Sequence, residues 1–460
     1  MLKKPKIFKY DKLVIIAMPL LGLPAGGFIR AHKVLHHLHD ILQDHDIQIE
    51  LYTPPSLILN TLLRYDKEES YKVLDIIVKD LKHFLPKYNI FNTFFDYMIK
   101  YIIQEYEKYF KLISNNIKQK IINFPSIYLD RINRIEKYFT KKYLYRIKKP
   151  FAIYTMNENI EAIISTKYFA LGSKAPVSIM LQLPPYPEIT PNKVFTKFNI
   201  KYISTFSLSR NIKKIYDKIA QENLHLLMAV SPTPFLESPS ILEVIKRNNV
   251  RVYIPKPSNA YDKELINYRS TRKDPCLVTY FGRLTPFKGL YDLLYIWKII
   301  ERNVSCAKLQ IIGKFDKYIY KYNFFNLVKK LELKNIEYLG YIPKRSRLYQ
   351  IVSRASILLY PSYHDSFSLT VLESIALGLV VAAYDIPAIR YIYSGLPNVF
   401  TVPRGDIKRL ASVIIDILKQ DKALELVNNS KVIEFLRLYG SWNNVARAEA
   451  RALLRVLRKS

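Results

Sequence analysis

Residues 355–378 read ASILLYPSYHDSFSLTVLESIALG, a pattern that predicts a strand, a polar loop and a helix. The apolar run 357–360 has the length of a buried strand, and a proline ends it. Apolar residues then recur at helical spacing over 367–377. In an α/β sheet, phosphates bind where a strand's carboxyl end leads into a helix. Asp365 and Glu373 frame this loop, so both carboxylates can point into one cleft.

The two acids carry a family resemblance. The pattern D-x-F-x-L-x-x-L-E at 365–373 resembles the paired-acid motif of retaining glycosyltransferase family 4, which has the GT-B fold. The resemblance implies that Asp365 contacts hydroxyls of a donor sugar, that Glu373 holds ribose hydroxyls, and that helix amides bind the phosphates. The other donor-binding residues expected here are Phe367, Ser368, Leu369 and Thr370. The alternative is an ordinary strand–turn–helix with two solvated acids.

This motif also departs from the family. The family has Glu-Gly-Phe-Gly where this chain has Asp-Ser-Phe-Ser at 365–368. Glycine allows a ligand to approach the backbone closely, so the two serines change what the loop can do. A second departure is Gln182, which stands at a strand end where mannosyltransferases that extend dolichol-linked oligosaccharides have a histidine. These mannosyltransferases are the members that the chain resembles most in this region.

Composition bounds the possible functions. The chain has 460 residues, too many for one core, and its 49% hydrophobic content is that of a globular protein. The net charge of +32 favours binding to polyanions, which include nucleic acid, an anionic membrane and phosphorylated substrates. No run of about 18 uncharged apolar residues predicts a membrane-spanning helix.

The cysteines and histidines predict no metal site. Cys276 and Cys306 lack metal-ligand spacing and form no disulfide framework, so we expect reduced thiols in an intracellular compartment. One helix expected near the N-terminus carries several histidines without paired acids, and we expect surface or interface roles for them. They are His32, His36, His37 and His39.

The first glycine loop follows the first strand. Residues 12–18 read KLVIIAM, a buried strand, and an amphipathic helix is expected over 28–42. Gly26 and Gly27 lie between them and allow a phosphate or sugar to approach backbone N–H groups. They resemble the family's glycine loop facing the donor. The spacing does not match a dinucleotide fingerprint.

Residues 60–149 form a helical, basic stretch rich in tyrosine and isoleucine. Between Tyr101 and Pro150 there are 12 Lys and Arg against 4 Asp and Glu. An apolar stripe at helical spacing comprises Tyr106, Tyr109, Phe110, Ile113 and Ile117. Such a helix can lie on an anionic membrane, or it can pack its stripe on the core while its lysines are solvated. Both readings stay open.

The second half contains a strong phosphate-binding signal. The strand 276–281 leads into Gly282-Arg283-Leu-Thr-Pro-Phe-Lys288-Gly, which resembles the family's diphosphate clamp. Arg283 offers a bidentate fork and Lys288 a point charge, and the resemblance makes both catalytic together with Asp365. Gly340 resembles the glycine turn near the nucleotide base.

Alternating strands and helices predict an α/β fold, with two doubly wound sheets facing a cleft. The resemblance names it GT-B, with two Rossmann-like domains. We expect an acceptor-side domain over 1–255 with its helical insertion at about 60–150, a nucleotide-sugar domain over 256–435, and a helix over 436–460 that crosses back to the first domain.

The predicted function is retaining transfer of a hexose from a UDP-, GDP- or ADP-sugar, without a metal or other cofactor. The expected acceptor is a lipid-linked or other glycan at the cytoplasmic face of a membrane, whose anionic surface is a second partner. The alternatives are a GT-B nucleotide-sugar epimerase, and a non-catalytic binder of polyanions or nucleic acid. A nucleic-acid partner or a DNA-modifying transferase is less favoured, because no DNA-binding module is recognisable.

Overall fold

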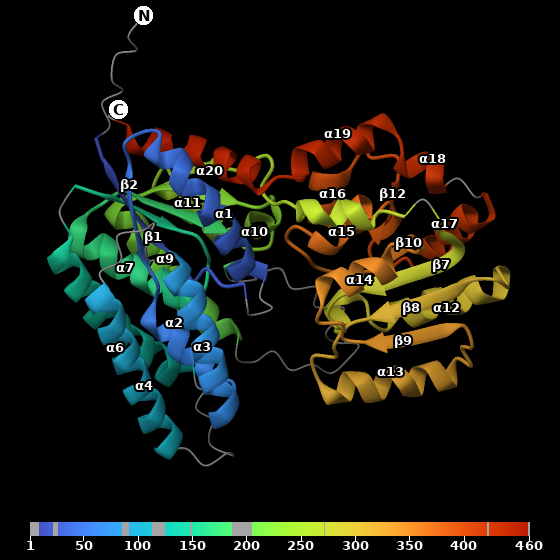
Figure 1. Cartoon of the computed structure of the whole chain (residues 1–460), viewed down its shortest axis with the longest axis horizontal. Coiled ribbons are helices and arrows are strands. Elements are labelled where there is room, and N and C mark those ends of the chain that lie inside the picture. The colour runs from blue at the N-terminus through green and yellow to red at the C-terminus, as the bar shows by residue number, and fades with distance from the viewer. Residues whose placement is uncertain are drawn as a thin grey trace, which may run out of the picture.

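The computed structural model describes residues 9–21, 26–84, 92–112, 125–147, 150–185, 205–270, 272–420 and 423–458. Its strands form two six-stranded sheets, and every pairing within them is parallel. Figure 1 shows the sheets in separate halves of the molecule, each covered by helices. This confirms the predicted α/β fold with two Rossmann-like domains.

The first sheet has the order β2-β1-β3-β4-β5-β6. Its strands are β1 (Lys12–Ile16), β2 (Gln48–Tyr52), β3 (Ala152–Thr155), β4 (Val177–Leu181), β5 (Leu224–Ala229) and β6 (Arg251–Tyr253). The central strands are apolar along nearly their whole length, because helices cover both faces of a parallel sheet. The order reverses between β1 and β3, which makes a crevice at the carboxyl ends of these two strands.

The second sheet has the order β12-β11-β10-β7-β8-β9. Its strands are β7 (Asp274–Phe281), β8 (Lys308–Ile312), β9 (Ile336–Gly340), β10 (Ala355–Tyr360), β11 (Val380–Tyr384) and β12 (Val399–Val402). Counted from β7, this is the 3-2-1-4-5-6 order of dinucleotide-binding folds, read from the far edge. The order reverses between β7 and β10, the strands that precede the two strongest sequence motifs.

The helices of the first half are α1 (Gly26–Gln43), α2 (Pro55–Leu62), α3 (Lys67–Phe84), α4 (Asn92–Leu112), α6 (Pro125–Arg146), α7 (Ile160–Ser173), α9 (Thr205–Asn223), α10 (Thr233–Leu236) and α11 (Pro239–Arg247). Those of the second half are α12 (Asp292–Asn303), α13 (Tyr318–Lys330), α14 (Arg345–Val352), α15 (Leu369–Ala376), α16 (Pro387–Tyr393), α17 (Ile407–Gln420), α18 (Ala423–Val427), α19 (Ser430–Tyr439) and α20 (Trp442–Leu457). None of the helices in the described ranges is both long enough and apolar enough to span a membrane.

The helical stretch predicted between β2 and β3 folds as α2, α3, α4 and α6. Its apolar side chains face inward: Met98, Ile102 and Tyr106 of α4 are buried, as are Ile135 and Phe139 of α6. The solvated-lysine reading therefore fits the described part of the stretch. Of the other residues in the predicted stripe, Tyr109 and Phe110 have side chains outside the described set, and Ile113 and Ile117 lie outside the described residues.

The last helix lies against the first domain. α20 packs along α1. Arg30 of α1 and Glu449 of α20 form a fully buried ion pair, and Tyr154 donates a hydrogen bond to Glu449 at 2.5 Å. Arg30 also donates through Nη2 to the carbonyl of Ser258 at 2.8 Å. This pair thus joins the first domain to both stretches of chain that run between the domains.

Two expectations about single residue types need correction. Cys276 and Cys306 are joined by a disulfide with Cα atoms 5.7 Å apart, so the expectation of reduced thiols is wrong for this structure. The spacing hid the pair because β7 and β8 are adjacent in the sheet although 30 residues separate the cysteines. His32 and His39 are buried, rather than surface groups, since they lie on the inward face of α1.

Candidate active site

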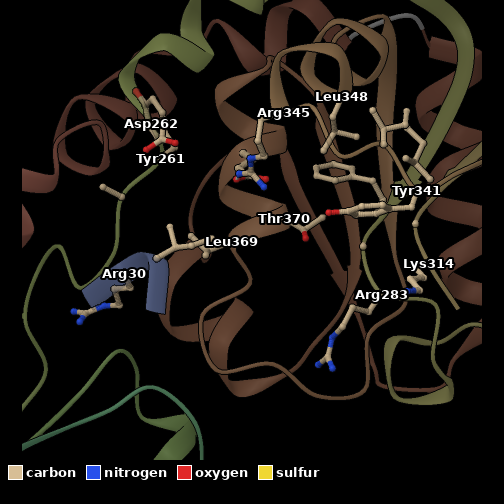
Figure 2. Close-up of a pocket in the computed structure, with 18 of the residues that line it drawn as sticks. Arg30, Tyr261, Asp262, Arg283, Lys314, Tyr341, Arg345, Leu348, Leu369 and Thr370 are labelled. Carbon is tan, nitrogen blue, oxygen red and sulfur yellow. The ribbon is translucent and has the colours of Figure 1, made fainter. Parts of the chain in front are cut away.

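A cavity of about 330 Å³ lies between the two domains, at the carboxyl ends of the strands of the second sheet. Its wall includes Ile29 and Arg30 from α1 of the first domain. From the second domain it includes Gly282, Arg283, Gly313, Lys314, Tyr341, Arg345, Leu369, Thr370 and Glu373. Figure 2 shows Arg345, Thr370 and Tyr341 around one side of this space, with Arg30 across from them. The cavity therefore occupies the crevice that the strand order predicts for a ligand.

The loop after β7 supplies Gly282 and Arg283. The Arg283 side chain is 74% exposed, and its Nη1 lies 3.7 Å from a carboxylate oxygen of Asp316. At that exposure the ion pair is weak, so the guanidinium is available to an anionic ligand in the cavity. Gly313, after β8, must be glycine because a Cβ atom there would lie 1.9 Å from the carbonyl oxygen of Gly282. The two loops consequently pack backbone to backbone beneath the cavity.

Lys288 lies in a different environment from Arg283. Its Nζ donates to Asp365 Oδ2 at 2.6 Å and to the carbonyl of His364 at 3.1 Å. Tyr360, at the end of β10, donates to the same carboxylate oxygen at 2.5 Å. Lys288 and Asp365 are not among the described residues that line the cavity. The structure thus joins Lys288 to the first acid instead of to the site of Arg283.

These contacts set the protonation of Asp365. Burial works against its charged form, but the Lys288 ammonium and the hydrogen bonds from Lys288 and Tyr360 outweigh burial. They hold the pKa of the Asp365 carboxyl well below its usual range. The backbone N–H of Ser366 adds a hydrogen bond to Oδ1 at 2.8 Å. Asp365 is therefore a fixed carboxylate, suited to accept hydrogen bonds from sugar hydroxyls and unsuited to act as a general acid.

Glu373, the second acid, lies on α15 and lines the cavity. Its carboxylate forms an ion pair with Arg345, the first residue of α14, and accepts a hydrogen bond from Tyr349 at 3.4 Å. Burial raises the pKa of Glu373 above its ordinary value, with Arg345 acting in the opposite direction. Any hydroxyl ligand of Glu373 must share this carboxylate with Arg345.

Ser368, where the resembling motif has glycine, takes a backbone conformation that favours glycine. Its φ of 66° and ψ of 61° are left-handed, and it caps the start of α15. Its carbonyl, with that of Phe367, accepts a hydrogen bond from the Tyr393 hydroxyl at 2.9 Å and 3.1 Å. The buried Tyr393 thus helps to hold a non-glycine residue in a left-handed conformation.

The other donor-binding residues predicted from the sequence fall into two groups. Leu369 and Thr370 line the cavity. The Phe367 side chain is buried and packs edge-to-face on Tyr393 with ring centroids 6.1 Å apart, so only its backbone can reach a ligand. Gly340 has φ of 72°, and open space surrounds the position of an added Cβ.

Gly27, in the first glycine loop, lies beside Gln182, the residue found where the resembling mannosyltransferases have histidine. α1 begins at Gly26, and the carbonyl of Gly27 accepts a hydrogen bond from Asn157 at 3.2 Å. A Cβ atom on Gly27 would lie 3.4 Å from the side-chain oxygen of Gln182. Gln182 donates its amide to the carbonyl of Met156 at 3.0 Å. Gln182 consequently faces the start of α1, at the carboxyl ends of β3 and β4.

Sequence reasoning missed several residues at this site. Arg345, Tyr349 and Tyr360 touch the two acids, and Lys314 and Tyr341 line the cavity. Tyr360, Lys314 and Tyr341 end a strand or follow one within two residues, which was the available signal. Nothing in the sequence shows that Arg345 and Tyr349 contact Glu373 or that Tyr360 contacts Asp365. Within the described ranges, no group of three or more His, Cys, Asp or Glu side chains could hold a metal ion.

Comparison with known proteins finds a family match within the second domain. Residues 262–432 match the family model described as glycosyl transferases group 1. This part of the second domain is therefore similar to glycosyl transferases group 1. This match contains Arg283, Lys288, Asp365 and Glu373. The match covers less than half of the chain and none of the first sheet. The fold of the first domain is therefore known from the structure and not from this family model.

Similar proteins and solved structures also include glycosyltransferases. An uncharacterized glycosyltransferase of Haemophilus influenzae is 23% identical over 190 residues, which are 41% of this chain and 51% of the relative. The match thus spans about half the length of that protein. A structure described as trehalose-6-phosphate from E. coli bound with UDP-2-fluoro glucose has a TM-score of 0.61 at 11% identity, over 97% of this chain and 100% of its own. Anabaena Alr3699/HepE in complex with UDP has a TM-score of 0.58 at 12% identity, over 96% and 99%. These two likenesses show a shared fold of both domains.

Proposed function

We propose that this protein is a retaining glycosyltransferase that moves a hexose from a nucleotide sugar to an acceptor. One observation carries the proposal: a cavity at the strand-order reversal of a glycosyltransferase group 1 domain, lined by Arg283, Thr370 and Glu373. The structural relatives hold UDP or UDP-2-fluoro glucose, which makes UDP the first nucleotide to test.

The proposed chemistry assigns a task to each group. Transfer breaks the bond between the anomeric carbon and the diphosphate, so negative charge grows on the leaving diphosphate. Arg283, at the cavity wall, stabilises that charge, and Glu373 binds the ribose. Lys288 acts mainly by fixing Asp365, whose carboxylate orients the sugar hydroxyls. The acceptor hydroxyl oxygen forms the new bond to the anomeric carbon on the face that the diphosphate leaves, and its proton goes to the departing diphosphate oxygen. The proposal includes no metal ion and no covalent enzyme intermediate.

The acceptor enters from the first domain in this proposal. The start of α1, with Gly27 and Gln182, faces the crevice of the first sheet. We place there a lipid-linked or other glycan at the cytoplasmic face of a membrane, in keeping with the net charge of +32. Labelling of free thiols in protein from intact cells tests the location. Labelled Cys276 and Cys306 would agree with a cytoplasmic protein, whereas an unlabelled pair, joined by the disulfide of this structure, would contradict it.

The test is product analysis with a panel of UDP-, GDP- and ADP-hexoses, with and without a lipid or glycan extract as acceptor. Release of nucleoside diphosphate that depends on the acceptor, with product of the donor's own anomeric configuration by NMR, is the expected result. Epimer or free sugar formed without an acceptor would favour the epimerase instead. No turnover with any donor and acceptor, from protein that binds polyanions, would favour the binding protein.

A further inference from the structure

Helix α13 exposes an aromatic stripe. Tyr318 is 81% exposed, Tyr322 55% and Phe325 38%, and their spacing places them on one side of the helix. Ile319, 51% exposed, lies beside them. The opposite side of α13 is anchored in the core by Phe324, which is fully buried. A helix that is apolar on both sides needs a second environment for its outer side.

The outer side of α13 is also cationic. Lys321, Lys329 and Lys330 are exposed on the helix, and Lys317 is exposed immediately before it. The helix sequence YIYKYNFFNLVKK contains no acidic residue. Asp316, just ahead of it, is turned to Arg283. Tyrosine rings with a polar edge, surrounded by lysines whose stems are apolar, suit the headgroup region of a bilayer.

In their described parts, the basic helices of the first domain expose tyrosines but bury their aliphatic and phenylalanine side chains. The apolar side chains of α4 and α6, among them Ile102 and Phe139, are buried in the core of that domain. The large side chains that α6 exposes in its described part are Tyr138 at 41% and Tyr145 at 94%, and no exposed aliphatic or phenylalanine side chain accompanies them there. Figure 1 shows α13 along the lower edge of the second domain. In the same view, α3, α4 and α6 of the first domain extend toward the lower side of the molecule.

We propose that the exposed face of α13 docks the protein onto an anionic lipid bilayer. Charge complementarity selects this partner, because four lysines surround the aromatic stripe and anionic headgroups attract them. Lys314, which lines the donor cavity, precedes α13 by only four residues, so docking brings that cavity close to the lipid surface. The inference deepens the proposed function, since it rests on an acceptor held in a membrane.

The experiment measures binding to vesicles of phosphatidylcholine alone and with about 30 mol % phosphatidylglycerol, by flotation at moderate salt. The wild type is expected to float with the anionic vesicles and not with the neutral ones. Tyr318→Ser/Tyr322→Ser and Lys321→Glu should each lower the partition coefficient at least about tenfold. Tyr145→Ser, an exposed tyrosine on basic α6, is the matched control and should bind like the wild type.

A gain-of-signal variant tests insertion directly. Tyr322→Trp should show a blue-shifted emission on anionic vesicles and quenching by brominated lipid, whereas Tyr145→Trp should show neither. Binding of each variant to heparin is measured as well, to report on charge alone. The proposal would be overturned if the wild type did not float, or if Tyr145→Ser lost flotation instead of the α13 variants. It would also be overturned if the α13 variants lost heparin binding and vesicle binding equally. Thermal stabilisation by nucleotide sugars, measured on the same variants, reports separately on the donor site, so the two proposals fail independently.

Discussion

Ser368 is a non-glycine residue in a left-handed backbone conformation. Its left-handed φ of 66° costs an L-amino acid about 1–2 kcal/mol. Ser368→Gly should therefore raise the free energy of unfolding, by about 0.5–1 kcal/mol after glycine's greater entropy in the unfolded chain is subtracted. Urea denaturation measures the change. Ser362→Gly, in the same loop but not at positive φ, is the control and should not stabilise.

The Lys288–Asp365 pair makes a pH-dependent prediction. Because the pKa of Asp365 is depressed in the folded state, its stabilising contribution is present above the ordinary aspartate pKa and is lost as pH falls through the folded pKa. In Lys288→Met the cation is absent and burial raises the Asp365 pKa instead. The loss of unfolding free energy should then grow as pH rises from 4 to 7, reaching about 2–4 kcal/mol.

Denaturation of Lys288→Met at several pH values measures this loss, with the exposed Lys246→Met as control. A loss that is constant with pH would contradict the assigned partnership.

The residue scale also marks how far the sequence could be read. Strand ends and glycines located Arg283, Asp365 and Glu373 near one loop cluster. They could not show that Lys288 contacts Asp365 or that Arg345 contacts Glu373, because these pairs join residues 77 and 28 positions apart. Such pairings depend on strand order and helix rotation, which no local pattern encodes.

At the scale of elements, Glu136 on α6 is the buried centre of the helical insertion. It accepts hydrogen bonds from Tyr52, Ser56 and Ser165 at 2.5–3.0 Å. Burial nevertheless raises its pKa to about 7, with these hydrogen bonds opposing the rise. Because the pKa of Glu136 is higher in the folded protein than in the unfolded chain, its protonation stabilises the folded state. This contribution is fully present below the unfolded pKa and is lost as pH rises through the folded pKa.

Unfolding free energy should therefore contain a term that falls by about 3 kcal/mol between pH 4 and 8. Glu136→Gln, which cannot titrate, should lack this term, while the exposed Glu68→Gln on α3 should retain it. Thermal or urea unfolding across this range provides the comparison. Parallel pH profiles of Glu136→Gln and the wild type would show that the carboxyl does not titrate there.

The bounds of helices and strands were predicted well where the apolar periodicity was strong. What covers the apolar side of each helix was not predicted. The strands β1, β7 and β10 and the helices α1 and α15 lie within a few residues of their predicted bounds. The stripe of the helical insertion fitted membrane contact and core packing equally, since a helical period states which side is apolar but not what covers it. Only the packing of α4 and α6 decides that question.

At the scale of the whole molecule, the buried Arg30–Glu449 pair holds the last helix, α20, against the first domain. Removing one partner strands a buried charge, so Arg30→Met should cost about 3–5 kcal/mol. Arg30→Met/Glu449→Met should recover part of that loss, because no lone charge remains. A double-mutant cycle by denaturation measures the coupling, and additive losses would show that the two groups are independent.

The two-domain architecture followed from the alternation of strands and helices, and the return of the last helix from the resemblance. The disulfide between Cys276 and Cys306 did not, because their proximity is a property of the finished sheet. The cavity between the domains likewise combines α1 with loops more than 250 residues later, so its residues could be named only in part.

The most direct test is calorimetric titration of UDP, GDP and ADP into the wild type, Arg283→Ala/Lys288→Ala and the charge-matched control Lys246→Ala/Arg247→Ala on α11. One nucleotide should bind the wild type and the control with similar dissociation constants, and the Arg283→Ala/Lys288→Ala variant at least about tenfold more weakly. Failure of all three to bind the wild type, or equal binding by all three proteins, would contradict a nucleotide-sugar site in this cavity.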